Sequence, residues 1–267
     1  MPLKASNSDV FSGLISSFRR PLQMGILLAL LFVAGIFAGC GSDPEKPSTE
    51  AAEAQYNSAQ SFQKDERYEE AIRRYQEVKN KFPYSRFAIL SELAIADTYF
   101  LQESYPEAQV AYQNFKDMHP KHPKVDYVTY KLGLCYYLQL PPGADRDLSL
   151  ADKALQNFDE VIRLYPGGEN AKDAQEKKMA TLKMLAEKEV YIADFYFKKG
   201  QYLSAMNRYE GGLRKYPGQG FDAKILSRAA ICAARQANLD HARTLLKELE
   251  DKFPDSSEAK DARKEIQ

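Results

Sequence analysis

One pattern of small, large apolar and proline positions appears five times along the chain. Each copy has a small residue, a large apolar residue four positions later and a closing proline, as in YEEAIRRYQEVKNKFP. Residues four apart lie on one face of a helix, and a proline ends the helix. Each copy therefore predicts a helix with one packed face. The copies span residues 68–83, 105–120, 151–166, 202–217 and 239–254.

A partner helix is predicted ahead of these copies. Its pattern is a small residue three positions before an aromatic one, at Ala59/Phe62, Ala96/Tyr99, Gly133/Tyr136 and Ala193/Tyr196. Pairs of helices that recur in this way resemble the tetratricopeptide repeat, which is a helical hairpin. The predicted fold class is all-α, an α-solenoid of five such hairpins.

Unequal spacing between the closing prolines predicts how the repeats are grouped. Successive prolines lie 37, 46, 51 and 37 residues apart. The spacing of 46 includes Pro141, Pro142 and Gly143, which force a loop. The spacing of 51 has 14 extra residues without Gly or Pro, close to four turns at about 3.6 residues per turn. We therefore expect one long helix, about residues 171–199, that joins a three-repeat half to a two-repeat half.

The first forty residues have the layout of a secretory signal peptide. Arg19 and Arg20 precede an uncharged run at residues 22–38, and Cys40 follows. The sequence FAGC resembles the bacterial lipobox, which implies cleavage before Cys40 and a lipid anchor on it; Gly41 after the cysteine, where Asp would favour the inner membrane, implies the periplasmic face of the outer membrane. A retained membrane helix and an incidental cysteine are the alternatives.

These signals divide the chain into four expected parts. The polar residues after the cysteine include two prolines and cannot pack into a core, so they are expected to form a flexible tether. The expected parts are the signal peptide at 1–39, the lipidated N-terminus and tether at 40–52, repeats one to three at 53–168, and the long helix, repeats four and five and a capping helix at 169–267.

Composition and motifs argue against several function classes. The 37 basic and 37 acidic side chains balance, so the charge gives no support to nucleic-acid binding. Besides Cys40, only Cys135 and Cys232 are present, and both fall where a small buried residue is expected. His119 and His122 lie in the proline-rich turn HPKHP, and no HExxH, GxSxG or phosphate-binding glycine loop appears. We therefore predict no catalytic residues, no metal site and no cofactor.

The first helices of stacked hairpins line a concave face that such proteins use for extended segments of partners. In repeats one to three this face is predicted to be rich in aromatic residues. The alternative for each ring is that it packs between neighbouring helices. The predicted groove residues are Tyr56, Gln60, Leu93, Asp97, Phe100, Tyr130, Leu134 and Tyr137.

A family resemblance combines these features. The lipobox, five repeats, the insertion in repeat three, the long helix and the stretch HPKVDYVTYKLGL together resemble the BamD (ComL/YfiO) family of barrel-assembly lipoproteins. The resemblance implies a non-enzymatic subunit that works with the barrel-forming BamA protein to fold β-barrels into the outer membrane. It also implies that repeats one to three recognise the aromatic-ended C-terminal segment of unfolded barrels, and that repeats four and five face BamA.

Arg208 is the residue that the resemblance assigns to the partner contact. In the family, the arginine at this point of an NRxEG segment contacts an acidic group of the barrel partner. The repeat pattern alone has Arg208 pointing away from its partner helix, where a solvated arginine is the alternative. Two other function classes stay open: another periplasmic repeat lipoprotein, such as a secretin pilotin or a cell-division factor, and an envelope hydrolase with repeats as an accessory module.

Overall fold

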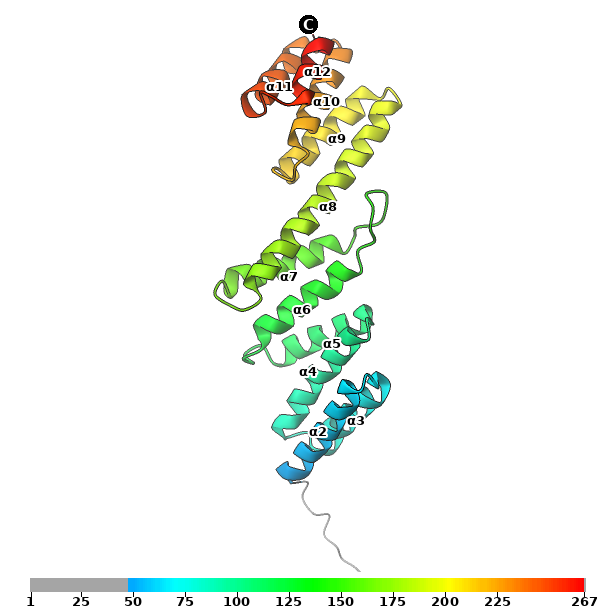
Figure 1. The fold of residues 1–267 in the computed structure, drawn as a ribbon, viewed down its shortest axis with the longest axis vertical. Coiled ribbons are helices and arrows are strands. Elements are labelled where there is room, and N and C mark those ends of the chain that lie inside the picture. Colours follow the sequence, from blue (N-terminus) through cyan, green and yellow to red (C-terminus); the bar gives the residue numbers. More distant parts are fainter. Residues whose placement is uncertain (1–47, 267) are drawn as a thin grey trace, which may run out of the picture. The chain divides into compact units, whose positions relative to one another are not determined.

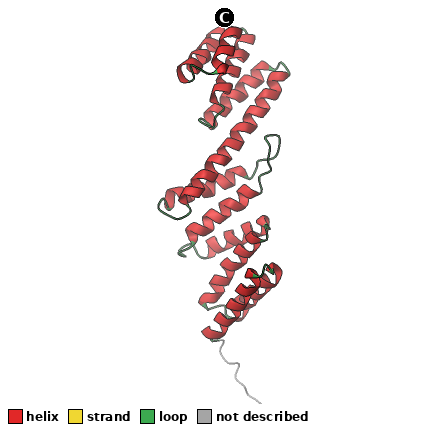
Figure 2. Ribbon diagram, in the orientation of Figure 1, coloured by secondary structure: helices red, strands yellow, loops and turns green. Residues whose placement is uncertain are grey.

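The computed structural model describes residues 48–266, in which helices pair into successive hairpins (Figure 1). This described part contains helices and connecting loops and no strand (Figure 2). The helices are α2 (Thr49–Lys64), α3 (Tyr68–Lys81), α4 (Arg86–Leu101), α5 (Tyr105–Met118), α6 (Val125–Leu138), α7 (Ala151–Leu164), α8 (Ala171–Lys198), α9 (Tyr202–Lys215), α10 (Asp222–Arg235), α11 (Leu239–Lys252) and α12 (Ser257–Ile266).

Each helix from α2 to α12 packs against the next along the chain, so the hairpins stack in sequence order. The repeat positions carry this packing. Each repeated small residue and each large residue four positions later is buried, which confirms the predicted face. These positions are Ala71 and Tyr75, Ala108 and Tyr112, Ala154 and Phe158, Ala205 and Tyr209, and Ala242 and Leu246.

The closing prolines end the second helix of each hairpin. A proline disfavours the helical conformation of the residue before it. That residue is the C-cap in every repeat, as at Phe82 with φ −129° and ψ 51° and Tyr216 with φ −134° and ψ 57°. The sharp end turns the chain toward the next hairpin.

Helix α8 is the predicted long helix, and its 28 residues confirm that prediction. Ala174, near its start, belongs to the core cluster of repeats two and three. Val190 and Ala193, near its end, belong to the cluster of repeats four and five. One continuous helix therefore takes part in both cores.

The N-terminal boundary of the repeats differs from the prediction. Helix α2 begins at Thr49, so residues 49–52 are helical rather than part of a tether. The reason is that Ala52 is fully buried in a cluster with Val78, Phe82 and Phe87. The signal peptide, Cys40 and residues 41–47 of the expected tether lie outside the described residues.

Candidate functional site

The predicted groove residues divide into a buried and a half-buried set. Leu93, Tyr130 and Leu134 are between 3% and 9% exposed and belong to the core of repeats two and three. The prediction that these three side chains line an open groove is therefore wrong. Those that remain half-buried, here called the groove set, are Tyr56, Gln60, Asp97, Phe100 and Tyr137.

Tyr130 is buried because the long helix supplies a partner for its hydroxyl group. The hydroxyl donates a hydrogen bond to Asp173 near the start of α8, and the ring lies 6.4 Å from that of Phe158. A buried tyrosine needs such a partner. The position of Asp173 follows from how α8 packs against α6 and α7, which the repeat pattern does not specify.

Asp97 is the polar centre of the groove set. Its Oδ1 accepts hydrogen bonds from the Tyr112 hydroxyl at 2.6 Å and from the Tyr127 hydroxyl at 2.9 Å. Burial raises the pKa of the Asp97 carboxyl group, and these two hydrogen bonds act in the opposite direction. Nearby, the Lys131 ammonium group lies 3.8 Å from the centre of the Phe100 ring. This arrangement joins α4, α5 and α6 and leaves Lys131 beside an aromatic face.

Tyr56 also has a packing role. Its ring centre lies 5.4 Å from that of Tyr75 and 5.6 Å from that of Phe87. Burial raises the pKa of the Tyr56 hydroxyl group. This ring therefore contributes to the contact between the first two hairpins as well as to the half-exposed surface.

Arg208 lies in a pocket between α8 and α9. The guanidinium Nη1 donates to Glu189 Oε2 at 3.1 Å, with the Arg208 side chain 48% exposed and that of Glu189 17% exposed. Glu189 belongs to the partner helix α8, so the expectation that Arg208 points away from that helix is wrong. The pocket, about 400 Å³ in volume and here called the Arg208 pocket, is lined by Glu189, Tyr196, Ser204, Asn207, Arg208, Gly211 and Lys215.

A glycine explains how Glu189 reaches this position. A Cβ atom on Gly212 would lie 3.1 Å from the Cβ of Glu189, so α8 and α9 approach closely at this point. Gly211 has no such neighbour within 4 Å and lines the pocket. Glu189, Asn207 and Lys215 were not predicted as site residues, because their role depends on the packing of two helices.

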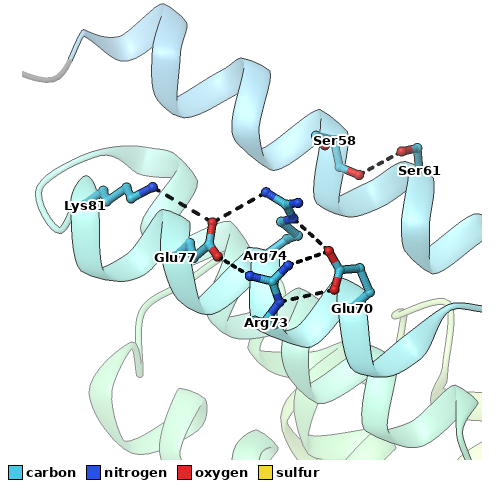
Figure 3. A network of polar contacts seen from close by, with 7 residues as sticks. All are labelled: Ser58, Ser61, Glu70, Arg73, Arg74, Glu77 and Lys81. Atoms are coloured by element: carbon cyan, nitrogen blue, oxygen red, sulfur yellow. Dashed lines mark hydrogen bonds and ion pairs between the residues drawn. The ribbon is translucent and has the colours of Figure 1, made fainter.

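The charged network on α3 differs from the Arg208 pocket because all its side chains come from one helix. Glu70 and Glu77 pair with Arg73 and Arg74 along the helix, and Lys81 extends the row (Figure 3). The partners are three or four residues apart on one helix surface. Exposed pairs of this kind contribute little to stability. These charged side chains keep this surface of α3 polar.

Candidate metal ligands and nucleophiles are few. Within residues 48–266, no group of three or more His, Cys, Asp or Glu side chains could hold a metal ion. Cys135 and Cys232 are free and buried, as predicted, and burial raises the pKa of each thiol to about 12. His119 Nε2 lies 2.6 Å from Glu92 Oε2, so this histidine of the HPKHP turn joins α5 to α4.

No helix within the described range combines the length and the apolar character that crossing a membrane requires.

Comparisons with known proteins identify the family. Residues 48–232 match the family described as YfiO, outer membrane lipoprotein. An outer membrane protein assembly factor BamD of Neisseria meningitidis is 27% identical over 215 residues, which cover 77% of this chain and 80% of that protein. BamD of Caulobacter vibrioides is 28% identical over 195 residues, covering 72% and 64% of the two chains.

Solved structures with related repeats are more distant. The TPR2AB-domain:pHSP90 complex of yeast Sti1 has 16% identity and a TM-score of 0.42, and the match covers 79% of this chain and 81% of that one. The family match runs from α2 through α9 into α10. The chain belongs to the YfiO family of outer membrane lipoproteins.

Proposed function

We propose that the chain is a non-enzymatic lipoprotein subunit of the machinery that assembles β-barrel proteins in the outer membrane. The observation that carries this proposal is membership of the YfiO family, together with relatives named outer membrane protein assembly factor BamD. A stack of helical hairpins suits such a role because it offers extended surfaces to partner segments.

The proposed contact with a BamA-like barrel protein is made by repeats four and five through the Arg208 pocket. Arg208 and Lys215 give this pocket two positive charges beside the acid Glu189. A guanidinium group can bind a carboxylate through two parallel hydrogen bonds, which lysine cannot reproduce. An acidic side chain of the barrel partner is therefore the ligand that fits.

Charge reversal tests this contact. Arg208→Glu should abolish co-purification of the barrel protein from detergent-solubilised outer membranes, because repulsion replaces attraction. Arg214→Glu is the matched control, since Arg214 lies on the same helix but is 72% exposed and outside the pocket. Normal co-purification by a folded Arg208→Glu variant would rule the contact out.

The proposed contact with unfolded barrel substrates is made by the groove set in repeats one to three. Phe100 and Tyr137 present half-buried aromatic rings, with Lys131 beside Phe100 and Lys177 5.5 Å from the centre of the Tyr137 ring. Rings with adjacent cations suit an extended segment that carries aromatic residues and a carboxylate.

Crosslinking to synthetic C-terminal peptides of barrel proteins tests the groove. The double variant Phe100→Ala, Tyr137→Ala should crosslink several-fold less than the wild type, because both ring contacts are lost. Tyr84→Ala is a suitable control, since that ring is fully exposed and lies outside the groove set. Equal crosslinking by the double variant and the control would assign the two rings to packing.

The lipid on Cys40 is the proposed membrane anchor. Cys40→Ala should leave the precursor unprocessed, because acylation precedes cleavage in the lipoprotein pathway that the lipobox implies. The check is the mass of the protein in fractionated membranes. Mature-sized Cys40→Ala protein in the outer-membrane fraction would contradict the proposed anchor.

A further inference from the structure

Repeats two and four are copies of each other at a constant shift of 97 residues. The stretch ADTYF at 96–100 recurs as ADFYF at 193–197, and Pro120 recurs as Pro217. By the same shift, Glu92 of α4 corresponds to Glu189 of α8. A comparison of the two copies separates what every such hairpin contains from what is particular to repeat four.

The cationic character of the Arg208 pocket is particular to repeat four. Repeat two has a pocket of about 440 Å³ at the equivalent place between α4 and α5, but its lining is largely apolar. In this lining Val110 stands for Asn207 and Ala111 for Arg208. Met118, the counterpart of Lys215, lines a neighbouring hollow with Glu92 and with Lys79 of the preceding hairpin. Both hairpins have a pocket at this place, and the one in repeat four is lined by cationic side chains.

The shared glutamate has different partners in the two copies. Glu92 pairs with Lys79 of the preceding hairpin at 3.4 Å and with His119 at 2.6 Å. In repeat four the helices of the preceding hairpin pair with an earlier part of α8, where Lys178 lies 2.6 Å from Asp159 of α7. The loop of that hairpin reaches Lys188, whose Nζ donates to the Arg146 carbonyl oxygen. The longer first helix thus leaves Glu189 facing α9, where its partner is Arg208.

The geometry holds Glu189 firmly and leaves part of Arg208 free. Glu189 is largely buried and lies against Gly212, one turn of α9 beyond Arg208. A guanidinium group has five N–H donors, and the pair with Glu189 uses Nη1. Within the described part of the chain, the edge formed by Nε and Nη2 has no hydrogen-bond acceptor.

We propose that Glu189 is the positioning residue of the Arg208 pocket. It fixes the guanidinium group so that the Nε and Nη2 edge faces the pocket and receives a carboxylate side chain of the partner. Lys215 adds positive charge, and the Asn207 amide adds a donor. The proposal rests on the proposed docking of this pocket to the barrel protein.

The positioning role and simple electrostatics predict opposite changes in partner affinity when Glu189 loses its negative charge. Removal of the negative charge of Glu189 makes the pocket more positive, so electrostatics alone predicts tighter binding of an acidic partner. Positioning predicts weaker binding, because a neutral glutamine accepts only a weaker hydrogen bond from the guanidinium group, so that Arg208 regains rotamers that it must lose on binding. The sign of the change therefore decides between the two.

The binding experiment compares Glu189→Gln with Glu187→Gln in the full-length lipoprotein. Both variants lose one negative charge from α8, but Glu187 is exposed and lies outside the pocket. The probe is the soluble periplasmic part of the cognate BamA-like protein. Glu189→Gln should weaken its binding about tenfold, while Glu187→Gln should leave binding equal or slightly tighter. Unchanged or tighter binding by Glu189→Gln overturns the positioning role.

A measurement without the partner separates this inference from the proposed function. Nitrogen NMR of the Arg208 Nε group reports rotation of the guanidinium about the Nε–Cζ bond. Rotation should be slow in the wild type and fast in Glu189→Gln and in Gly212→Ala, whose new methyl group displaces Glu189. Fast rotation in the wild type overturns the inference. A held guanidinium in a wild type that does not bind the barrel protein supports positioning and contradicts the proposed function.

Discussion

Two aspartates at equivalent positions tie consecutive helices together. Asp97 accepts hydrogen bonds from Tyr112 and Tyr127, and Asp194 accepts one from Tyr209 and pairs with Lys224 at 2.7 Å. In both cases one partner comes from the same hairpin and one from the next. These side chains link neighbouring repeats through polar contacts.

Asp97 should matter for stability through its hydrogen bonds rather than its charge. Asp97→Ala leaves the hydroxyl groups of buried Tyr112 and half-buried Tyr127 without this partner and should lower the free energy of unfolding by about 2–4 kcal/mol. Asp97→Asn keeps an oxygen acceptor and should cost less than about 1 kcal/mol at pH 7. Urea unfolding of both variants measures the difference, and equal losses would contradict this role.

The wild type and Asp97→Asn should also differ in how their stability changes with pH. Burial raises the pKa of Asp97, so the folded state binds its proton more tightly than the unfolded state. The wild type should therefore lose stability relative to Asp97→Asn as pH rises from the ordinary aspartate value through the raised one. A difference that is independent of pH between about 3.5 and 7 would contradict the raised pKa.

Cys135 and Cys232 should be unreactive in the folded protein. Both thiols are buried, and their pKa values of about 12 leave almost no thiolate at pH 8. Iodoacetamide should modify them only after unfolding, as peptide mass mapping can show. Modification of either cysteine in the native protein within minutes would indicate that its helix opens.

Helix α8 is the element that connects the two core clusters. Its start packs with repeats two and three and its end with repeats four and five, while Thr181 lies buried between these parts. Because helix α8 takes part in both, a break in its middle should affect both cores.

A proline at Lys183 tests the continuity of α8. Lys183 is exposed, so the change removes no core contact, but it deletes an interior helix hydrogen bond and clashes with the preceding turn. The expected loss is about 3 kcal/mol or more. Hydrogen exchange should accelerate around residues 179–187 in Lys183→Pro and stay protected in Lys183→Ala. Unprotected exchange there in the wild type would contradict a continuous helix.

Gly133 and Gly211 should respond oppositely to replacement by alanine. A Cβ on Gly133 of α6 would lie 2.8 Å from the Phe158 ring, so Gly133→Ala should destabilise the protein by about 1–3 kcal/mol. Gly211 of α9 has open space, so Gly211→Ala should stabilise it by up to about 1 kcal/mol through helix propensity. Thermal unfolding compares the two, and a tolerated Gly133→Ala would contradict the close approach of α6 and α7.

At the scale of the whole molecule, the fold was more predictable than the site. Each hairpin carries its own pattern, so the burial of residues such as Ala108 and Tyr112 followed from neighbours in sequence. The burial of Tyr130 depends on Asp173, 43 residues away, and the pairing of Arg208 with Glu189 depends on how α8 packs against α9. Such contacts are set by the stacking of helices, which a repeat pattern does not contain.

The central claim is that the Arg208 pocket docks this lipoprotein to a barrel-forming protein of the outer membrane. Photocrosslinking in cells tests it most directly, with a photoreactive amino acid at Asn207 in the pocket and, as control, at Glu187 outside it. The account predicts that position 207 forms an adduct with one large outer-membrane β-barrel protein, identified by mass spectrometry, and that position 187 does not. The claim is contradicted if position 207 gives no adduct with such a protein while the lipoprotein is folded and located in the outer membrane.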